Sequence, residues 1–289
     1  MSSLGHAARR QHRFDPVGSL SRIFAAGVEF VYLCCVPLSV RQAVEMFHLV
    51  FLRALVAKGD DKGLLALKGG CNLRFYFGSI RYSEDIDLDV VVIAKDTLKN
   101  KVDRLLASPA ISAPLKTRGI TLLESSAPKQ TDTTQRWKVG LRVDGRDVPI
   151  RTKIEFSRRD TIEGALYEAA DREVLRPYGL TPMLATHYTT AMAIAQKIHA
   201  LAGRVEPQAR DIFDLSLLFA RPEAAQVELE SAKRRHVPIA TEQAMSISFD
   251  EYASKVVAFL DPAQAAPYSG RSAWDAMQNE VVSRLEALR

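Results

Sequence analysis

The first regular pattern in the chain is an apolar stripe between Val40 and Lys58. Apolar residues recur there at spacings of three and four, and charged residues occupy other positions. This periodicity predicts an amphipathic helix that ends at Gly59. The stripe consists of Val44, Phe47, Phe51 and Leu55. The preceding residues 1–20 are polar, basic and aperiodic, so we expect a loose arm or a leader to the first helix.

A strand, a turn, a helix and a second strand are predicted next. Residues 64–67 form a short apolar run, Lys68-Gly69-Gly70 favours a turn, and residues 71–77 are typical of one or two helical turns. In residues 85–93, carboxylates alternate with apolar residues before a β-branched run, which indicates a strand with one polar face. Three carboxylates therefore point to the same side of that strand: Asp85, Asp87 and Asp89.

A helix, a loop and a β-hairpin follow. The pattern predicts a helix over 95–107, and Ser, Pro and Ala residues around 108–114 favour a surface loop. Apolar residues then alternate with polar ones on both sides of Asp144-Gly145, which predicts a hairpin over 137–156. In its second arm, Glu155 lies on the face opposite to the apolar residues. It shares that face with Arg151 and Lys153.

The character of the chain changes near residue 180. Thr181-Pro182 has the form of a helix start, the Ala-rich run to Leu201 is strongly helical, and residues 210–219 give a further helix. We therefore expect an α+β protein in three parts. These are an N-terminal arm and leader (1–39), a domain with a mixed sheet and flanking helices (40–180), and a mainly helical C-terminal domain (181–289).

Composition narrows the class of protein. With 289 residues, 47% hydrophobic and 25% charged, the chain can bury a core, which excludes a disordered protein. Its three cysteines cannot form a disulfide framework. The apolar run 28–36 is too short to span a bilayer, and no secretory signal is recognisable, so we expect a cytoplasmic protein without a membrane partner. The formal charge of +5 permits a polyanionic partner.

The most informative stretch for chemistry is Lys68-Gly69-Gly70 followed by Asp85-Ile86-Asp87. Two glycines let the backbone approach a phosphate closely, and the helix after them offers free N–H groups. Asp85 and Asp87 lie side by side on a strand, an arrangement that suits hard cations such as Mg²⁺. Glu155 is the candidate third carboxylate. Each part has an ordinary alternative, because a glycine pair can be only a turn and carboxylates can simply form a polar strand face.

Four motifs together resemble the AbiEii/AbiGii toxin family of the DNA polymerase β-like nucleotidyltransferase superfamily. The resemblance covers residues 40–220 approximately and is far more specific as an ordered set than in any single motif. It implies a nucleotidyltransferase fold followed by a helical half, and the toxin role in a type IV toxin–antitoxin or phage-defence pair. The motifs are LKGGCNLR (67–74), RYSEDIDL (81–88), QKIHA (196–200) and RDIFDL (210–215).

By this resemblance, Asp85 and Asp87 are metal-binding catalytic residues and Asp211 is a further catalytic acid. Lys197 contacts the triphosphate, and Ser83 lies beside the nucleotide phosphates. Relatives usually carry Ser or Thr where this chain has Cys71, so a hydroxyl contact to phosphate is missing at that position.

The residues by themselves leave other interpretations open for several of these positions. Lys197 could be a surface lysine beside an apolar stripe. Asp211 could be a first-turn helix acid or could pair with Arg204. His199 has no second ligand at metal spacing, so we expect a packed or surface histidine. Cations could also surround the cleft and steer an anionic substrate: Arg74, Arg81, Arg151 and Lys153. A basic cluster over 233–236 is either solvated or in contact with RNA.

The residues and the resemblance together predict a Mg²⁺-dependent nucleotidyltransferase that transfers a nucleotide from an NTP to an acceptor, the 3′ end of RNA, and the resemblance to some relatives favours tRNA. A separate antitoxin, encoded nearby and not held in a stable complex, is the expected protein partner. Two alternatives stay open at this point: transfer to a hydroxyl of a protein or small molecule, and a non-catalytic regulator that binds nucleotide or RNA.

Overall fold

The computed structural model describes residues 22–25, 28–31, 38–59 and 61–289. The predicted arm over residues 1–20 lies outside these residues. The chain divides into two compact units, residues 1–37 and residues 38–289. In the first unit, β1 (Arg22–Ala25) pairs antiparallel with β2 (Val28–Val31). All further elements belong to the second unit.

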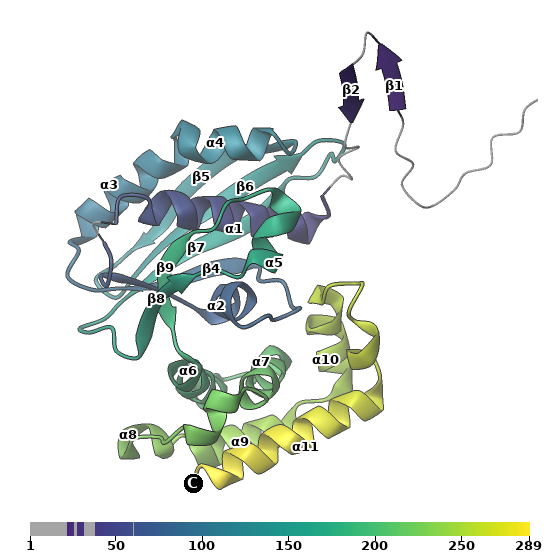
Figure 1. The fold of residues 1–289 in the computed structure, drawn as a ribbon. Coiled ribbons are helices and arrows are strands. Elements are labelled where there is room, and N and C mark those ends of the chain that lie inside the picture. Colours follow the sequence, from purple (N-terminus) through teal and green to yellow (C-terminus); the bar gives the residue numbers. More distant parts are fainter. Residues whose placement is uncertain (1–21, 26–27, 32–37, 60) are drawn as a thin grey trace, which may run out of the picture. The chain divides into compact units, whose positions relative to one another are not determined.

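A seven-stranded mixed sheet forms the first part of the second unit, in the order β5-β6-β7-β4-β3-β9-β8 (Figure 1). Strand β4 pairs antiparallel with β3 and parallel with β7, while β3 pairs parallel with β9. The strands are β3 (Leu65–Lys68), β4 (Asp85–Val90), β5 (Ile120–Gln130), β6 (Thr134–Val143), β7 (Ile150–Arg158), β8 (Ala165–Ala169) and β9 (Leu184–Tyr188).

Three helices cover one face of this sheet: α1 (Val40–Val56), α3 (Lys95–Leu106) and α4 (Pro109–Lys116) (Figure 1). Helix α1 starts with a capping box, in which Ser39 and Gln42 satisfy each other's backbone N–H groups. Phe47, Phe51 and Leu55 of its apolar stripe share one hydrophobic core with the inward residues of the β6–β7 hairpin. Shorter elements are α2 (Gly69–Tyr76), α5 (Arg172–Leu175) and η1 (Arg176–Tyr178).

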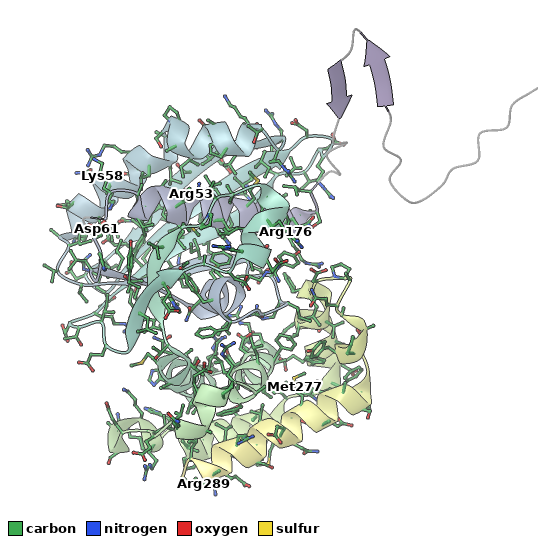
Figure 2. All side chains as sticks on the ribbon, viewed as in Figure 1. Arg53, Lys58, Asp61, Arg176, Met277 and Arg289 are labelled. Atoms are coloured by element: carbon green, nitrogen blue, oxygen red, sulfur yellow. The ribbon has the colours of Figure 1, made fainter. Side chains whose placement is uncertain are left out.

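The rest of the chain is helical and has a core of its own, to which Met277 contributes (Figure 2). The α+β class and the succession of a mixed sheet and helices are therefore as predicted. The elements of this part are α6 (Thr190–Gly203), α7 (Ala209–Phe219), η2 (Pro222–Gln226), α8 (Ser231–Arg234), α9 (Val237–Ser246), α10 (Phe249–Lys255), η3 (Val257–Phe259), η4 (Ala266–Tyr268) and α11 (Arg271–Ala287).

Two local predictions were wrong. Residues 108–114 are not a loop: Pro109 stands at the first position of α4, where a proline fits, and buried Ile111 anchors that helix to the core. The helix expected from Thr181 begins only at Thr190, because residues 184–188 pair with β8 and β3 as strand β9. In both places tertiary packing outweighed local propensity.

No helix among the described residues is both long enough and apolar enough to cross a membrane.

The packing of α4 gives a stability test. Ile111 is fully buried, so Ile111→Ala removes core contacts and leaves a cavity, and we expect a loss of about 2–5 kcal/mol in the free energy of unfolding. Val148 is 76% exposed, so Val148→Ala is the control and changes stability by less than about 0.5 kcal/mol. Urea unfolding followed by circular dichroism measures both. Equal stability of the two variants would show that α4 does not pack as described.

Candidate functional site

Side chains alternate between the two faces along strand β4. Ile86 and Leu88 enter the core beneath α1, so Asp85 and Asp87 project from the opposite face of the sheet. The register with its neighbours fixes what lies beside each carboxylate. On the parallel neighbour β7, Lys153 lies opposite Asp85 and Glu155 lies opposite Asp87. On the antiparallel neighbour β3, Lys68 lies opposite Asp87. The three predicted metal ligands thus project from adjacent positions on one face.

The glycine turn packs directly against these carboxylates. Gly69 has a φ of +65°, and a Cβ atom there would lie 2.9 Å from Oδ2 of Asp87. A Cβ at Gly70 would lie 2.6 Å from Oγ of Ser83. Gly69 needs to be glycine for both its left-handed backbone and its close approach to Asp87, and Gly70 needs to be glycine for its close approach to Ser83. Both glycines are the first residues of α2, so its N–H groups and positive dipole end lie beside Asp87 and Ser83.

An open cleft with about 870 Å³ of empty space joins this turn to the helical part of the chain. Sequence-predicted residues from four separate segments line it: Lys68, Gly69, Asp87, Glu155 and Lys197. Its remaining lining residues are Asn72, Leu73, Arg159, Ala193, Gln196, His199, Ala200 and Arg204. Gly70, Ser83, Asp85 and Asp211 are not among the residues that line it.

Ser83 and Asp85 are linked through the backbone. The Ser83 hydroxyl donates a hydrogen bond of 2.8 Å to the carbonyl oxygen of Asp85. The Cys71 thiol donates to the same oxygen at 3.3 Å and is fully buried, and burial raises its pKa well above the usual range. Cys71 is therefore a packing residue that holds the start of β4, which agrees with the missing phosphate contact.

Lys197 reaches the cleft from α6 and is held from behind by two buried acids of α7. Its Nζ donates to Oδ1 of Asp211 at 3.0 Å and to Oδ2 of Asp214 at 2.5 Å. Both carboxylates are fully buried, and Arg81 donates to Asp214 at 2.8 and 3.1 Å. Arg204 lies 3.4 Å from Asp211. Asp211 thus contacts the cleft lysine, and its own catalytic role stays a prediction.

These contacts set the charge of the buried acids. Burial by itself would raise the pKa of Asp214, but Arg81 and Lys197 outweigh it and hold the pKa below its usual range.

For Asp87, burial raises the pKa to about 6; Lys68 opposes the rise, while Asp85 and Glu155 add to it. Asp87 therefore lies in a carboxylate-rich place where an added cation would be stabilising.

The carboxylates have a donor chemistry suited to Mg²⁺, which prefers oxygen ligands. Cations of the chain already occupy two of them: Lys153 lies 2.6 Å from Asp85, and Arg136 lies 2.6 Å from Glu155. Within the part of the chain that the structure describes, no group of three or more His, Cys, Asp or Glu side chains is arranged as a metal site. The three carboxylates are therefore ligands of the right chemical type on one sheet face. For all three to bind one ion, Lys153 and Arg136 must first turn away from them.

Other predicted cations lie elsewhere. Arg74 donates to Glu45 at 2.5 Å and does not line the cleft, so the prediction was wrong for Arg74. Arg81 does not line the cleft either, but it is buried against Asp214 directly behind the glycine turn, where a Cβ at Gly70 would lie 3.2 Å from its Nη2 atom. Arg151 is exposed and pairs with Glu124.

Among the polar residues of the cleft, Arg159 and Gln196 had no predicted role, and of these two Gln196 carried a signal because it lies in a motif of the resemblance. Arg204, which was named as a possible partner of Asp211, does lie beside it. A second cleft of about 870 Å³ shares Arg159, Gln196 and His199 with the first. Lys233 and His236 of the basic cluster line this second cleft, and the His236 ring meets His199 edge-on at 4.8 Å.

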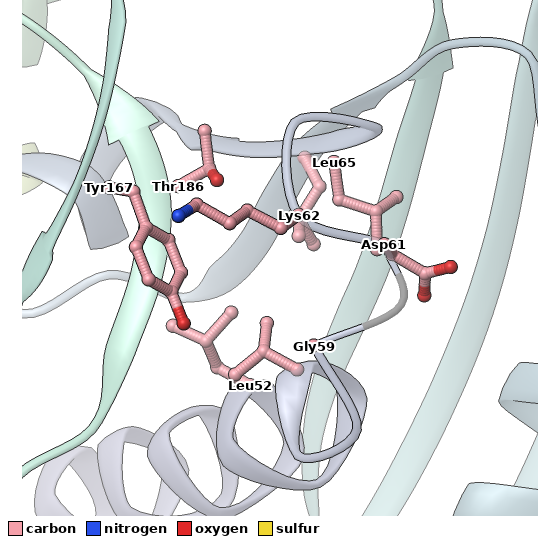
Figure 3. Close-up of a pocket in the computed structure, with 9 residues that line it drawn as sticks. Leu52, Gly59, Asp61, Lys62, Leu65, Tyr167 and Thr186 are labelled. Atoms are coloured by element: carbon pink, nitrogen blue, oxygen red, sulfur yellow. The ribbon is translucent and has the colours of Figure 1, made fainter.

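A separate pocket of about 350 Å³ lies beside the end of α1 (Figure 3). The Lys62 ammonium lies 4.2 Å from the centroid of the Tyr167 ring there. None of the predicted site residues lines this pocket, so the candidate site is the cleft on the open face of the sheet.

Comparison with known protein families gives a match over most of the chain. The family model described as "Nucleotidyl transferase AbiEii toxin, Type IV TA system" matches residues 50–287. No curated protein matches the chain.

Two solved structures share the fold. One is a proposed nucleotidyltransferase from H. pylori, with 21% identity and a TM-score of 0.52, covering 85% of this chain and 97% of that chain. The other is JHP933 from Helicobacter pylori, with 18% identity and a TM-score of 0.52, covering 87% of this chain and 96% of that chain.

The buried acid behind Lys197 predicts a pH dependence of stability. Because the pKa of Asp214 is lowered in the folded chain, its ion pairs stabilise the fold above the unfolded pKa of about 3.9, and this contribution is lost as the pH falls through the folded pKa. Asp214→Asn should therefore cost about 3–5 kcal/mol at pH 7 and progressively less below pH 4. Denaturant unfolding at pH 7, 4 and 3 measures the difference. A cost that is the same at all three values would contradict the assignment.

Proposed function

The chain belongs to the AbiEii nucleotidyl transferase toxin family of type IV toxin–antitoxin systems, and we propose that it adds a nucleotide from an NTP to the 3′ end of tRNA in a Mg²⁺-dependent reaction. Membership makes the chain a nucleotidyltransferase and implies an antitoxin partner. The observation that carries the proposal is the cleft in which Gly69, Asp87, Glu155 and Lys197 meet.

The proposed nucleotide site combines three features that favour a triphosphate. The Gly69-Gly70 turn presents backbone N–H groups at the start of α2 without a side chain in the way. Lys197 and Lys68 line the same cleft and add positive charge. Because Asp211 and Asp214 hold Lys197 on one side, its ammonium group is oriented before a substrate arrives.

The proposed metal ligands are Asp85, Asp87 and Glu155, which project from neighbouring positions of β4 and β7. Bound there, Mg²⁺ would supply positive charge to the phosphates and the leaving pyrophosphate. Asp85 and Glu155 are available to it only when Lys153 and Arg136 turn away. In the transfer, the acceptor hydroxyl oxygen bonds to the α-phosphorus of the NTP and the bond to pyrophosphate breaks, so the chain needs no covalent intermediate.

Several features support an RNA acceptor. The chain is basic, with a formal charge of +5, and Lys233 and His236 line the second cleft, which shares residues with the first. Modification of the tRNA 3′ end would remove the site of aminoacylation and stop translation, which is a sufficient basis for toxicity.

We further propose that the antitoxin acts without a stable complex.

The carboxylates provide the first test of this function. Asp85→Asn and Asp87→Asn should each lower nucleotide transfer at least about 100-fold, because the charge that balances the phosphates and cation is lost. Asp96→Asn changes an exposed carboxylate of α3 and is the matched control. Radiolabel transfer and thermal unfolding are measured in parallel. Full activity of a folded Asp85→Asn protein would refute the proposal.

The acceptor and the metal are tested together with α-labelled NTPs. We expect label in the tRNA fraction of a mixture of tRNA and protein, loss of labelling with EDTA, and recovery with added Mg²⁺. Label in the protein fraction instead would favour a protein hydroxyl as acceptor. Nucleotide binding without pyrophosphate release would favour a regulator.

A further inference from the structure

The open face of the β5–β6–β7 sheet carries cations that the proposed reaction does not use. Along β6, Trp137, Val139 and Leu141 enter the core, so the residues between them project from the opposite face. Of these, Lys138 and Arg142 are exposed and make no hydrogen bond or ion pair within the described residues. They flank Gly140 on both sides.

Gly140 forms the floor of a hollow in this face. Its register partners are Arg151 on β7 and Glu124 on β5. A Cβ at Gly140 would lie 2.9 Å from Cγ of Glu124, so any other residue would crowd the hollow. About 480 Å³ of empty space lies here, and the lining residues are Glu124, Ser125, Ser126, Lys138, Val139, Gly140 and Arg151. The Glu124 side chain lies across buried Gly140, so the hollow combines two cations and serine side chains with one carboxylate.

The strand register brings like charges together at this place. Lys138 is directly opposite Lys153, and Lys129 is directly opposite Arg136. Asp85 holds Lys153 and Glu155 holds Arg136, so the cation of the first pair that has no carboxylate partner is Lys138, which lines the hollow. Glu124, which pairs with Arg151 at 3.2 Å, is the acid that lines the hollow. Lys138 and Arg151 line the hollow with Glu124, and Arg142 lies outside this lining, two residues from Gly140 on the same face of β6, so the charge around Gly140 is positive.

We propose that this hollow binds a phosphodiester group of the RNA acceptor, an inference that rests on the proposed function. Strand β6 is two strand spacings from β4, which is roughly 10 Å. Lys138 is in register with Lys153, which is in register with Asp85, so this distance runs straight across the strands from Asp85 to the hollow. An acceptor that has its 3′ end at Asp85 and Asp87 and runs across the sheet toward β6 brings a backbone phosphate to the hollow. Since phosphate contacts carry no sequence information, the hollow holds RNA of any sequence.

Removal of the three cations tests the proposal. The variant K138Q/R142Q/R151Q should bind a fluorescein-labelled RNA hairpin with a single-stranded 3′ overhang at least about tenfold more weakly. The slope of log affinity against log salt should become shallower by about 0.7, the value for one phosphate contact on a single strand. NTP affinity should not change. K58Q/K116Q/R172Q removes three exposed cations elsewhere and is the control for net charge. RNA affinity equal to that of this control would overturn the proposal.

A second variant predicts a gain that damage to the fold cannot imitate. Glu124→Gln removes the competing carboxylate and frees Arg151, so RNA binding should become about threefold to tenfold tighter. Unchanged or weaker binding would count against the hollow.

The two proposals fail separately. If transfer depends on Asp85 but the triple variant binds RNA normally, the hollow is wrong and the function stands. If the triple variant loses RNA binding but Asp85→Asn keeps transfer, the hollow stands and the catalytic assignment is wrong.

Discussion

The register of β4 between an antiparallel neighbour and a parallel one determines the position of every other part of the site. It sets Glu155 beside Asp87 and Lys153 beside Asp85 on one side, and Lys68 beside Asp87 on the other. A shift by one residue would turn both aspartates into the core and expose Ile86 and Leu88. The hydrophobic contact of those two residues beneath α1 therefore fixes the chemistry on the open face.

The helical part of the chain completes the site and holds the segment that leads into β4. Backbone hydrogen bonds join Tyr82 to Phe259 and Asp261 to Ile80. Arg81 in the same segment is buried against Asp214 of α7, which also holds Lys197. One ionic network thus positions a cleft lysine and the approach to the aspartates together, so a change at either end affects the other.

Charge is balanced locally across the open face. The carboxylates of β4 and β7 meet Lys153 and Arg136, and buried Asp89 meets Lys68 and Arg159. Further along the sheet, the balance changes to a surplus of cations around Gly140. A polar face that is acidic at one place and basic about two strands away suits a reaction in which a cation and a polyanionic acceptor must meet.

Local sequence determined much of this arrangement. Hydrophobic periodicity predicted α1, β3, β4, the β6–β7 hairpin and α7, because each pattern reports which side of its own element is buried. The two glycines and the Asp-x-Asp pattern indicated a turn and a carboxylate-bearing strand face, and the β3–β4 register then placed them side by side. Tertiary structure alone decided β9, α4, the burial of Arg74 and Arg81, and the placement of Asp211 behind Lys197. Each of these features depends on contacts with residues far away in the chain. The sequence around a side chain does not specify which distant residue it will contact.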